Sequence, residues 1–235
     1  MASKFFSNFP KIQYKLNDGK VIFIKDFFRK SKVEQEAVSS ITQYKKYELK
    51  EGERPDTLAT KLYGNADLHW VFFLVNEIEN YYDWYKDSAG FEEYMTKKYP
   101  GQVALASVST DIVSSSNKFL LGEKVTSVSS EGRIILVEPH MNRVVIEGGN
   151  FVNNETITGY ISGKSFTPTS VINHRDGIAF YKKDNLRRNT EASDYTAVTH
   201  FDNELSLNEE KRFINIISPN RIAGIVRKFE EVMSA

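Results

Sequence analysis

The stretch from Tyr47 to Asn76, YELKEGERPDTLATKLYGNADLHWVFFLVN, decides the fold of the first part of the chain. Tyr47 and Leu49 alternate with charged residues, which is the pattern of a half-buried strand, and Gly52 permits a tight turn behind them. Pro55 suits the first turn of a helix, because its missing N–H needs no partner there. The stretch therefore begins as a strand, a turn and the start of a helix.

Two short helices are predicted in the rest of this stretch. The first ends at Gly64, which tolerates the left-handed conformation of a helix stop, and Asn65 or Asp67 can cap the second. Each helix carries apolar residues at helical spacing, which indicates a buried face. These residues are Leu58, Ala59 and Leu62 in the first helix, and Leu68, Val71, Phe72 and Val75 in the second.

This strand–helix–helix order resembles the lysin motif. The chain departs from that motif in two places, because the junction from Glu53 to Asp56 is longer and no closing strand is evident after Asn76. In cell-wall proteins the motif binds glycans that contain N-acetylglucosamine, and the resemblance implies that Glu53, Arg54, Asp56 and Asn76 would line such a groove. The corresponding residues are Tyr47, Leu49, Gly52, Thr57-Leu58 and Tyr63-Gly64.

The chain also resembles the lysin-motif-containing baseplate wedge protein of T-even-like contractile-tailed bacteriophages. The segment from Asn208 to Ala235 is similar to that family's closing strand and helix. The resemblance implies a late structural virion protein, assembled in the host cytoplasm, that joins neighbouring wedge proteins into the baseplate ring, with the central hub as a further candidate partner. The matching residues are Gly52, Arg54-Pro55, Leu58-Ala59, Tyr63-Gly64-Asn65, Leu68, Trp70-Val71, Asn76 and Tyr81-Tyr82-Asp83-Trp84-Tyr85.

Composition excludes several classes of partner. The formal net charge of the 235 residues is zero, so no overall basic charge favours binding to nucleic acid. Cysteine is absent, which excludes disulfides and cysteine-based zinc sites. No apolar run approaches the roughly 18–20 residues that span a bilayer, so no membrane contact is expected. Aromatic residues make up 13% of the chain and favour either a core or a protein interface.

The expected fold class is α+β, in four segments. Residues 1–46 form an amino-terminal arm, with a strand at Val21 to Ile24 and a helix from Asp26 to Ser39 whose apolar side docks on another module or on a partner. Residues 47–101 form the lysin-motif-like module with an aromatic extension and a helix from Phe91 to Tyr99. Residues 102–185 form an inserted domain, and residues 186–235 form a loop, a strand and an amphipathic helix.

The inserted domain is predicted to be a small antiparallel β-barrel or sandwich. Its short strands recur at intervals of about ten residues with turn residues between them, and Pro139 to Asn142 makes a plausible hairpin connection. The predicted strands are Lys118 to Leu121, Glu123 to Val128, Arg133 to Glu138, Arg143 to Glu147, Glu155 to Ile161 and Ile178 to Lys182. The polar stretch from Asn185 to Ser206 is predicted to be a surface loop.

The carboxyl-terminal segment is predicted to contain a strand from Arg212 to Ile217 and a helix after Pro219. The helix has an apolar stripe that needs a covering surface, either within the chain or on a partner. The stripe consists of Ile222, Ile225, Val226, Phe229 and Val232.

No catalytic, cofactor or metal site is expected, so the chain is not predicted to be an enzyme. Gly159 to Ser165 resembles a phosphate-binding loop but has three residues between its glycines where four are needed, and a hairpin turn is the better interpretation. Adjacent pairs such as Glu92-Glu93 point to different helix faces and cannot act together. No Gly-x-Ser-x-Gly elbow accompanies a serine. The histidines His69, His140, His174 and His200 lie far apart in unlike contexts.

Two functions therefore remain open: docking to other proteins, and binding of wall glycan through the lysin-motif-like groove. The bulky aromatic residues of the module favour protein contact. Arg54 adds a guanidinium that can form bidentate ion pairs across an interface. The interface candidates are Arg54, Tyr63, Trp70, Phe73, Tyr81, Tyr82, Trp84, Ile222, Ile225 and Phe229.

Overall fold

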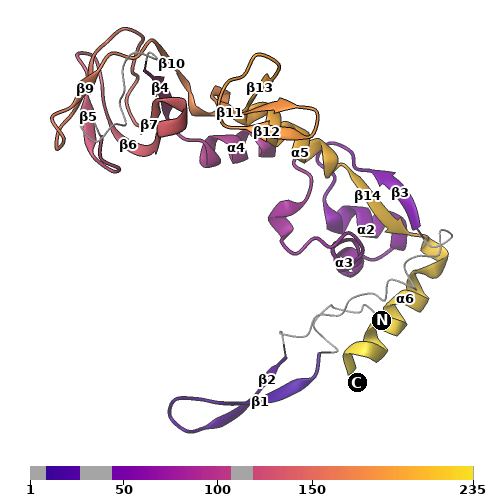
Figure 1. The fold of residues 1–235 in the computed structure, drawn as a ribbon. Coiled ribbons are helices and arrows are strands. Elements are labelled where there is room, and N and C mark those ends of the chain that lie inside the picture. Colours follow the sequence, from indigo (N-terminus) through magenta and orange to yellow (C-terminus); the bar gives the residue numbers. More distant parts are fainter. Residues whose placement is uncertain (1–8, 27–43, 107–118, 235) are drawn as a thin grey trace. The chain divides into compact units, whose positions relative to one another are not determined.

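The computed structural model describes residues 9–26, 44–106 and 119–234 (Figure 1). The chain divides into two compact units, one formed by Met1–Asp87 with Asn208–Ala235 and the other by Ser88–Leu207. Helices and small antiparallel sheets occur together, which confirms the predicted α+β class. The predicted helix from Asp26 to Ser39 lies almost entirely outside the described residues, and Asp26 itself is not helical.

The first unit contains a β-hairpin of β1 (Lys11–Lys15) and β2 (Val21–Lys25), which pair antiparallel. The predicted strand at Val21 to Ile24 is confirmed as β2. The turn between the strands uses Gly19 at φ 87°, a conformation that favours glycine.

The centre of the first unit is a two-stranded antiparallel sheet with helical segments in the intervening chain. Strand β3 (Tyr44–Glu48) pairs with β14 (Phe213–Ile217), so the strand that pairs with β3 comes from the far end of the sequence. The segments that follow β3 are α2 (Pro55–Tyr63), η1 (Ala66–His69), α3 (Trp70–Val75) and η2 (Tyr81–Asp83).

The helix boundaries follow the local sequence signals. Helix α2 has Pro55 in its first turn and ends at Gly64, whose φ of 70° is left-handed, as predicted. The Asn65 side chain accepts a hydrogen bond from the Asp67 amide at 3.0 Å and thereby caps η1. Strand, turn and two helical segments therefore occur in the predicted order.

Aromatic and aliphatic side chains from both ends of the chain form the core of the first unit. The described part of α6 (Ile222–Ser234) contributes Phe229, which is buried, while Ile222, Ile225 and Val226 pack against the same cluster. The apolar stripe of the last helix is therefore covered within its own unit; the side chain of Val232 lies outside the description. The buried residues of this core are Phe9, Leu49, Leu58, Ala59, Leu68, Trp70, Val71, Phe72, Trp84, Tyr85, Ile214, Ile216, Ile217 and Phe229.

The Asn208 side chain clamps the two chain segments between which the second unit is inserted. Its Oδ1 accepts from the Lys86 amide at 3.0 Å, and its Nδ2 donates to the Lys86 carbonyl at 2.8 Å. Asn208 is buried, so these two hydrogen bonds are shielded from water.

The second unit begins with α4 (Ser88–Lys98), which confirms the helix predicted at Phe91 to Tyr99, and continues into a seven-stranded antiparallel sheet. The strands lie in the order β10-β4-β7-β6-β5-β8-β9. Their bounds are β4 (Gln102–Leu105), β5 (Lys124–Thr126), β6 (Glu131–Glu138), β7 (Arg143–Glu147), β8 (Ile157–Gly159), β9 (Ser165–Phe166) and β10 (Ser170–Asn173).

Of the two predicted forms, barrel or sandwich, the barrel is wrong for the described residues, because β9 and β10 remain the two edges of this sheet. The sandwich stays a prediction. The link between β9 and β10 contains Pro168, which has no N–H to donate to a ladder. Residues of a loop hydrogen-bond to main-chain groups of β10 and of this link instead. The Val171 amide of β10 donates to Asn153 Oδ1 at 2.6 Å, and the Asn154 amide donates to the Pro168 carbonyl at 2.9 Å.

The predicted hairpin connections in this sheet are confirmed. Residues Pro139–Met141 form the short helix η3 between β6 and β7, and the turn within Gly159 to Ser165 joins the end of β8 to the start of β9. The strand predicted at Lys118 to Leu121 is wrong for the described residues 119–121, which are not a strand and lead into a turn at residues 121–122; the Leu120 amide donates to Glu123 Oε1 at 2.6 Å. The core of the sheet consists of Ala104, Ala106, Phe119, Val125, Ile134, Val144, Ile146, Phe151, Ile157 and Phe166.

A separate three-stranded sheet lies beyond the short helix η4 (His174–Asp176). It contains β11 (Ile178–Lys183), β12 (Leu186–Arg188) and β13 (Thr196–Thr199), and α5 (His200–Glu210) follows it. The prediction of a surface loop from Asn185 to Ser206 is therefore wrong. Exposed strands carry few apolar residues, so their composition resembles that of a loop.

Candidate interaction site

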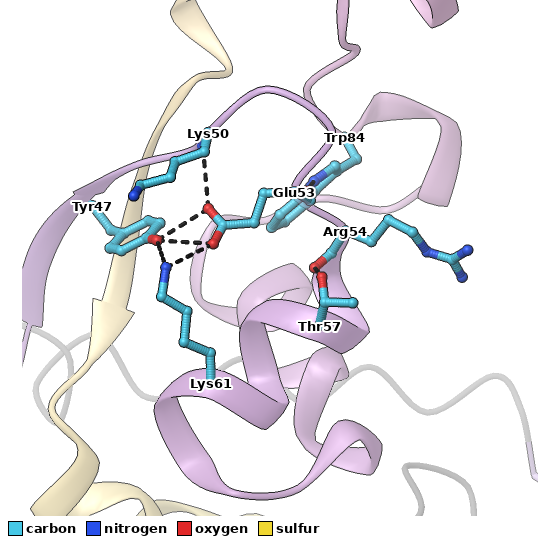
Figure 2. A network of polar contacts seen from close by, with 7 residues as sticks. All are labelled: Tyr47, Lys50, Glu53, Arg54, Thr57, Lys61 and Trp84. Carbon is cyan, nitrogen blue, oxygen red and sulfur yellow. Dashed lines mark hydrogen bonds and ion pairs between the residues drawn. The ribbon is translucent and has the colours of Figure 1, made fainter.

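The turn between β3 and α2 is held by a polar network around Glu53 (Figure 2). The Tyr47 hydroxyl donates to both Glu53 carboxylate oxygens at 3.0 Å, and the Lys50 amide donates to Oε2 at 3.1 Å. Lys61 Nζ from α2 lies 3.0 Å from Glu53 Oε1 and 2.8 Å from the Tyr47 hydroxyl. Strand, turn and helix are therefore joined through one carboxylate.

The environment of Glu53 favours its charged form. Burial alone would raise its pKa, but the hydrogen bonds from Lys50, Lys61 and Tyr47 and the attraction of Lys61 outweigh burial and leave the pKa lowered. The hydrogen bonds from Lys61 to Tyr47 and Glu53 correspondingly raise the pKa of Lys61. The ion pair is therefore formed at neutral pH and serves the local structure.

Backbone carbonyls at the same turn bind side chains from two other positions. Trp84 Nε1 donates to the Glu53 carbonyl at 2.9 Å, and Thr57 Oγ1 donates to the Arg54 carbonyl at 2.8 Å. The Arg54 side chain extends away from this network in Figure 2 and pairs with the exposed Asp56 carboxylate at 3.1 Å. Arg54 therefore presents its guanidinium to solvent.

Side chains close the outer edge of β14. Asn76 Nδ2 donates to the Asn215 carbonyl at 2.9 Å, and the Asn215 amide donates back to Asn76 Oδ1 at 2.8 Å. The Tyr63 hydroxyl donates to the Ile217 carbonyl at 3.1 Å. Asn76, one of the residues considered for a glycan groove, is therefore engaged in the fold in the same way as Glu53.

The aromatic residues of the module separate into a buried and an exposed group. Trp70 and Trp84 are buried, and the Trp70 ring lies 4.5 Å from that of Phe229. Phe73 makes edge contacts with Trp84 at 5.7 Å and with Tyr81 at 6.1 Å, and so connects the core to the surface. Tyr81 and Tyr82 lie outside the core, and Tyr82 remains 78% exposed.

The ten interface candidates thus occupy three environments. Arg54, Tyr81 and Tyr82 are exposed. The half-buried residues are Tyr63, Phe73, Ile222 and Ile225, and the buried ones are Trp70, Trp84 and Phe229. The structure places Tyr81 and Tyr82 side by side, with ring centroids 6.2 Å apart, while the Phe229 ring packs on Trp70.

The β1–β2 hairpin is an element with exposed apolar residues, of which the sequence analysis predicted only the second strand, β2. Ile12, Tyr14 and Phe23 are exposed there. The missed signal is the alternation of Ile12 and Tyr14 with polar residues ahead of the Asp18-Gly19 pair, because Asp-Gly between alternating runs is a strong hairpin signal.

The second unit has a polar network of its own around Glu204, a buried residue of α5. Its carboxylate accepts from the Tyr94 hydroxyl at 2.6 Å, from the Tyr99 hydroxyl at 2.9 Å and from Lys98 Nζ at 2.9 Å. Burial alone would raise the pKa of Glu204, but these hydrogen bonds and the charge of Lys98 outweigh burial and lower it. The network joins α5 to α4 and the residue that follows α4.

Two histidines lie beside this network. The His200 ring packs in a tilted arrangement with its centroid 4.5 Å from that of Tyr99, and it lies 5.2 Å from the His174 ring. Burial, followed by the charges of His174 and Arg143, lowers the pKa of His200 to about 4. Burial also lowers the pKa of His174, whose Nδ1 lies 3.1 Å from the Pro100 carbonyl. Both rings are therefore neutral in the folded chain near pH 7.

Neither a cluster of three metal-ligating side chains nor a membrane-spanning helix occurs in the part of the chain that the structure describes. No group of three or more histidine, aspartate or glutamate side chains in this part could hold a metal ion. None of its helices is both long and apolar enough to cross a bilayer.

Comparison with known proteins gives one family. Residues 4–114 match the family model of base plate wedge protein 53, which covers just under half of the chain and ends well before β14 and α6. No curated protein matches the chain. The matched residues include the β1–β2 hairpin, the Glu53 network and Tyr81-Tyr82. The match supports a structural protein of the phage tail baseplate, of the baseplate wedge type.

Proposed function

We propose that the chain is a structural subunit of a contractile phage tail that joins neighbouring wedge proteins into the baseplate ring. The observation that carries this proposal is the family match over residues 4–114. A structural baseplate protein acts by binding its neighbours, so its function depends on exposed side chains that a partner can cover. The central hub is a further candidate partner, and assembly would take place in the host cytoplasm late in infection.

The exposed residues Arg54, Tyr81 and Tyr82 are the proposed contact residues of the first unit. Tyrosine and arginine dominate the binding energy of many protein interfaces, because they combine a large apolar area with a polar end. Phe73 supports Tyr81 by its edge contact at 6.1 Å, which connects the exposed pair to the core.

We also propose that β3, α2, α3 and β14 form a lysin-motif-like unit that serves protein contact. The support is the order β3, α2 and α3 within the first unit, and the antiparallel pairing of β3 with Phe213–Ile217 from the far end of the sequence. The side chains of Glu53 and Asn76 are engaged in hydrogen bonds within the unit. They are therefore poorly placed to bind the hydroxyl and acetamido groups of a glycan, which favours the docking role.

A matched pair of tyrosine variants tests the proposal. Tyr82→Ser removes a ring from the proposed contact, whereas Tyr160→Ser removes an equally accessible ring, 80% exposed, from the β8–β9 turn of the second unit. The full-length variants are supplied in trans to a phage whose own copy of the gene carries a nonsense mutation. Quantitative mass spectrometry of purified tails then measures the amount of each protein that is incorporated.

We expect Tyr82→Ser to lower incorporation about tenfold, which corresponds to about 1.4 kcal/mol of binding free energy. Tyr160→Ser should leave incorporation unchanged. Arg54→Glu should lower incorporation by a similar or smaller factor, because the guanidinium strengthens binding most when it forms a bidentate ion pair with a partner carboxylate. Absence of the wild-type chain from tails, together with saturable retention of the full chain on chitin oligomers, would contradict the proposal and favour glycan binding.

A further inference from the structure

One face of the sheet of β11, β12 and β13 carries two cations directly opposite each other. Lys182 of β11 pairs with Arg187 of β12 in the antiparallel register, so the two side chains share a face. Both residues are exposed. Like charges in this position destabilise a sheet, and a negative group close to both side chains would remove that repulsion.

The sheet itself does not supply the negative group. On the other side of Lys182 lies Thr196 of β13, and Arg187 belongs to an edge strand. Asp194 binds Lys183 at 2.9 Å, and Lys183 points to the opposite face because it follows Lys182 in the strand. Within the described ranges, no carboxylate forms an ion pair with Lys182 or Arg187.

A second pair of like charges, Lys124 and Arg133 in the seven-stranded sheet, shows the contrast. These residues also lie directly opposite each other. Here Lys124 Nζ lies 2.6 Å from Glu131 Oε2, and Arg133 has Glu147 opposite it on β7. The larger sheet therefore supplies carboxylates to its own cations, whereas the smaller sheet leaves its two cations available to another molecule.

The Phe180 ring holds the Arg187 guanidinium in place. The guanidinium carbon lies 4.6 Å from the ring centroid. Such stacking uses the flat face of the group and leaves its N–H donors free at the edge. Strand β11, which carries Phe180, is itself held between β12 and β13. Arg187 is therefore partly ordered before it binds, which lowers the entropy that is lost on binding.

The surrounding charge favours a single carboxylate as the ligand over a polyanion. From Ile178 to Thr199 the chain has four cationic and three acidic side chains, so no broad basic surface surrounds the two cations. Nucleic acid needs several phosphate contacts on a basic surface. In contrast, the planar fork of one arginine matches the two oxygens of one carboxylate, and a lysine beside it adds a point charge.

We propose that Arg187 and Lys182 form a binding site for an aspartate or glutamate side chain of a neighbouring tail protein. The Arg187 guanidinium binds both carboxylate oxygens, and the Lys182 ammonium group binds the same carboxylate from the adjacent strand. The identity of the partner as a tail protein rests on the proposed function. The site gives the second unit a contact of its own, in addition to the proposed contact residues of the first unit.

Two adjacent arginines provide a matched test in the tail-incorporation assay. Arg187→Glu and Arg188→Glu change the net charge equally, but Arg188 pairs with Tyr181 and lies on the opposite face of the sheet. Arg187→Lys keeps the charge and loses the bidentate fork. Circular dichroism of each full-length variant checks that it is folded.

Arg187→Glu should lower incorporation about tenfold and Arg187→Lys about threefold, whereas Arg188→Glu should leave it near the wild-type level. Wild-type incorporation of folded Arg187→Glu, or an equal loss in Arg187→Glu and Arg188→Glu, would overturn the carboxylate site and leave the proposed function intact. Absence of the wild-type chain from tails would overturn both.

A cross-link without a spacer identifies the carboxylate. A carbodiimide activates a carboxylate and leaves as a urea when the lysine amine displaces it, so that an amide joins the two side chains. In purified wild-type tails, mass spectrometry should find Lys182 joined to an aspartate or glutamate of another tail protein. Lys182 joined only to carboxylates of this chain, in the same or a second copy, or to none, would overturn the proposal.

Two further measurements complete the test. Replacing the cross-linked carboxylate of the partner by arginine should restore most of the incorporation that Arg187→Glu loses, because the ion pair forms again with its charges exchanged. Failure of this rescue would overturn the pairing. Titration of the full chain with a fluorescent DNA duplex should show no binding that depends on Arg187, and binding that Arg187→Glu abolishes would assign the site to phosphate groups and overturn the proposal.

Discussion

Each compact unit contains a carboxylate that binds tyrosine and lysine side chains, but the two networks differ in the sequence distance they cover. Glu53 is bonded by Tyr47, Lys50 and Lys61, all within eight residues of it. Glu204 is bonded by Tyr94, Lys98 and Tyr99, more than a hundred residues earlier in the chain. The first network thus shapes one turn, whereas the second joins two distant helices.

The pH response of the two carboxylates has the same sign. Both pKa values are lowered in the folded chain. Each carboxylate therefore stabilises the fold above the ordinary glutamate pKa, and this contribution is lost as the pH falls through the lowered value. What separates the two networks is their surroundings, because Glu204 lies beside neutral histidines and Glu53 is surrounded by tyrosine and lysine.

The largest expected effect is that of Glu204→Ala, which should cost the second unit about 3 kcal/mol, because it leaves Lys98 and two tyrosine hydroxyls without their shared acceptor. The Glu204 side chain is 8% exposed but that of Lys98 is 43% exposed, which places the effect at the lower end of values for buried pairs. Hydrogen–deuterium exchange of the full chain should show faster exchange in α4 and α5 together.

Glu204→Gln is the matched control for that change, since an amide keeps an acceptor oxygen for one of the donors. It should restore about half of the lost protection in α4 and α5. Faster exchange in α5 alone, with α4 unaffected, would show that the network does not couple the two helices.

Acidification should affect the second unit more than the first. The folded pKa of His200 is about 4, below its unfolded value near 6.5, so the unfolded chain binds protons more readily between these values and stability falls as the pH is lowered through that window. From pH 7 to pH 5 the loss is about 2 kcal/mol at about 1.4 kcal/mol per pKa unit. His174, whose pKa is also lowered, adds a loss of the same sign.

Exchange measured at the two pH values, after correction for the intrinsic rate, should show this loss in peptides from Tyr99 to the start of α5. His200→Phe should reduce the loss while preserving the ring contact with Tyr99, because His200 Nε2 has no hydrogen-bond partner among the described residues. An unchanged pH dependence in that variant would exclude His200 as the titrating group.

The smallest effect is expected for Glu53→Ala, about 1.5 kcal/mol from the first unit, because the hydrogen bonds that it removes lie within one turn at the surface of the unit. The Glu53 side chain is 11% exposed, and its loss frees Tyr47 and Lys61 to contact water. Faster exchange should be confined to β3 and the first turns of α2. Spread of the effect into α3 would show that the network supports the whole core.

The sequence predicts the locally determined parts of the fold. Gly64 ends α2 and Asn65 caps η1 through interactions within a few residues, and such signals can be recognised in a single sequence. The pairing of β3 with β14 depends on contacts between residues more than 160 positions apart, for which the sequence pattern offers many equivalent partners. In the sheet of β11, β12 and β13 the sequence predicts only β11, because β12 and β13 are short strands with few apolar residues and their composition resembles that of a loop.

The candidate site is predictable by residue type but not by exposure. Trp70, Trp84, Tyr81 and Tyr82 all belong to aromatic clusters, and an aromatic ring serves a core and an interface equally well. Only the three-dimensional arrangement assigns Trp84 to the core through its bond to the Glu53 carbonyl and leaves Tyr82 accessible. Glu204 carries no local signal, because its partners lie on α4 and directly after it, more than a hundred residues earlier in the chain.

The clamp formed by Asn208 has a consequence for the insert that it encloses. Its two hydrogen bonds to Lys86 fix the points at which the chain leaves and re-enters the first unit. Whatever lies between these two points can lengthen, shorten or be exchanged without strain on β3, β14 or the helices between them. We therefore expect the first unit to keep its fold when the insert between these two points is replaced by one of another length or shape.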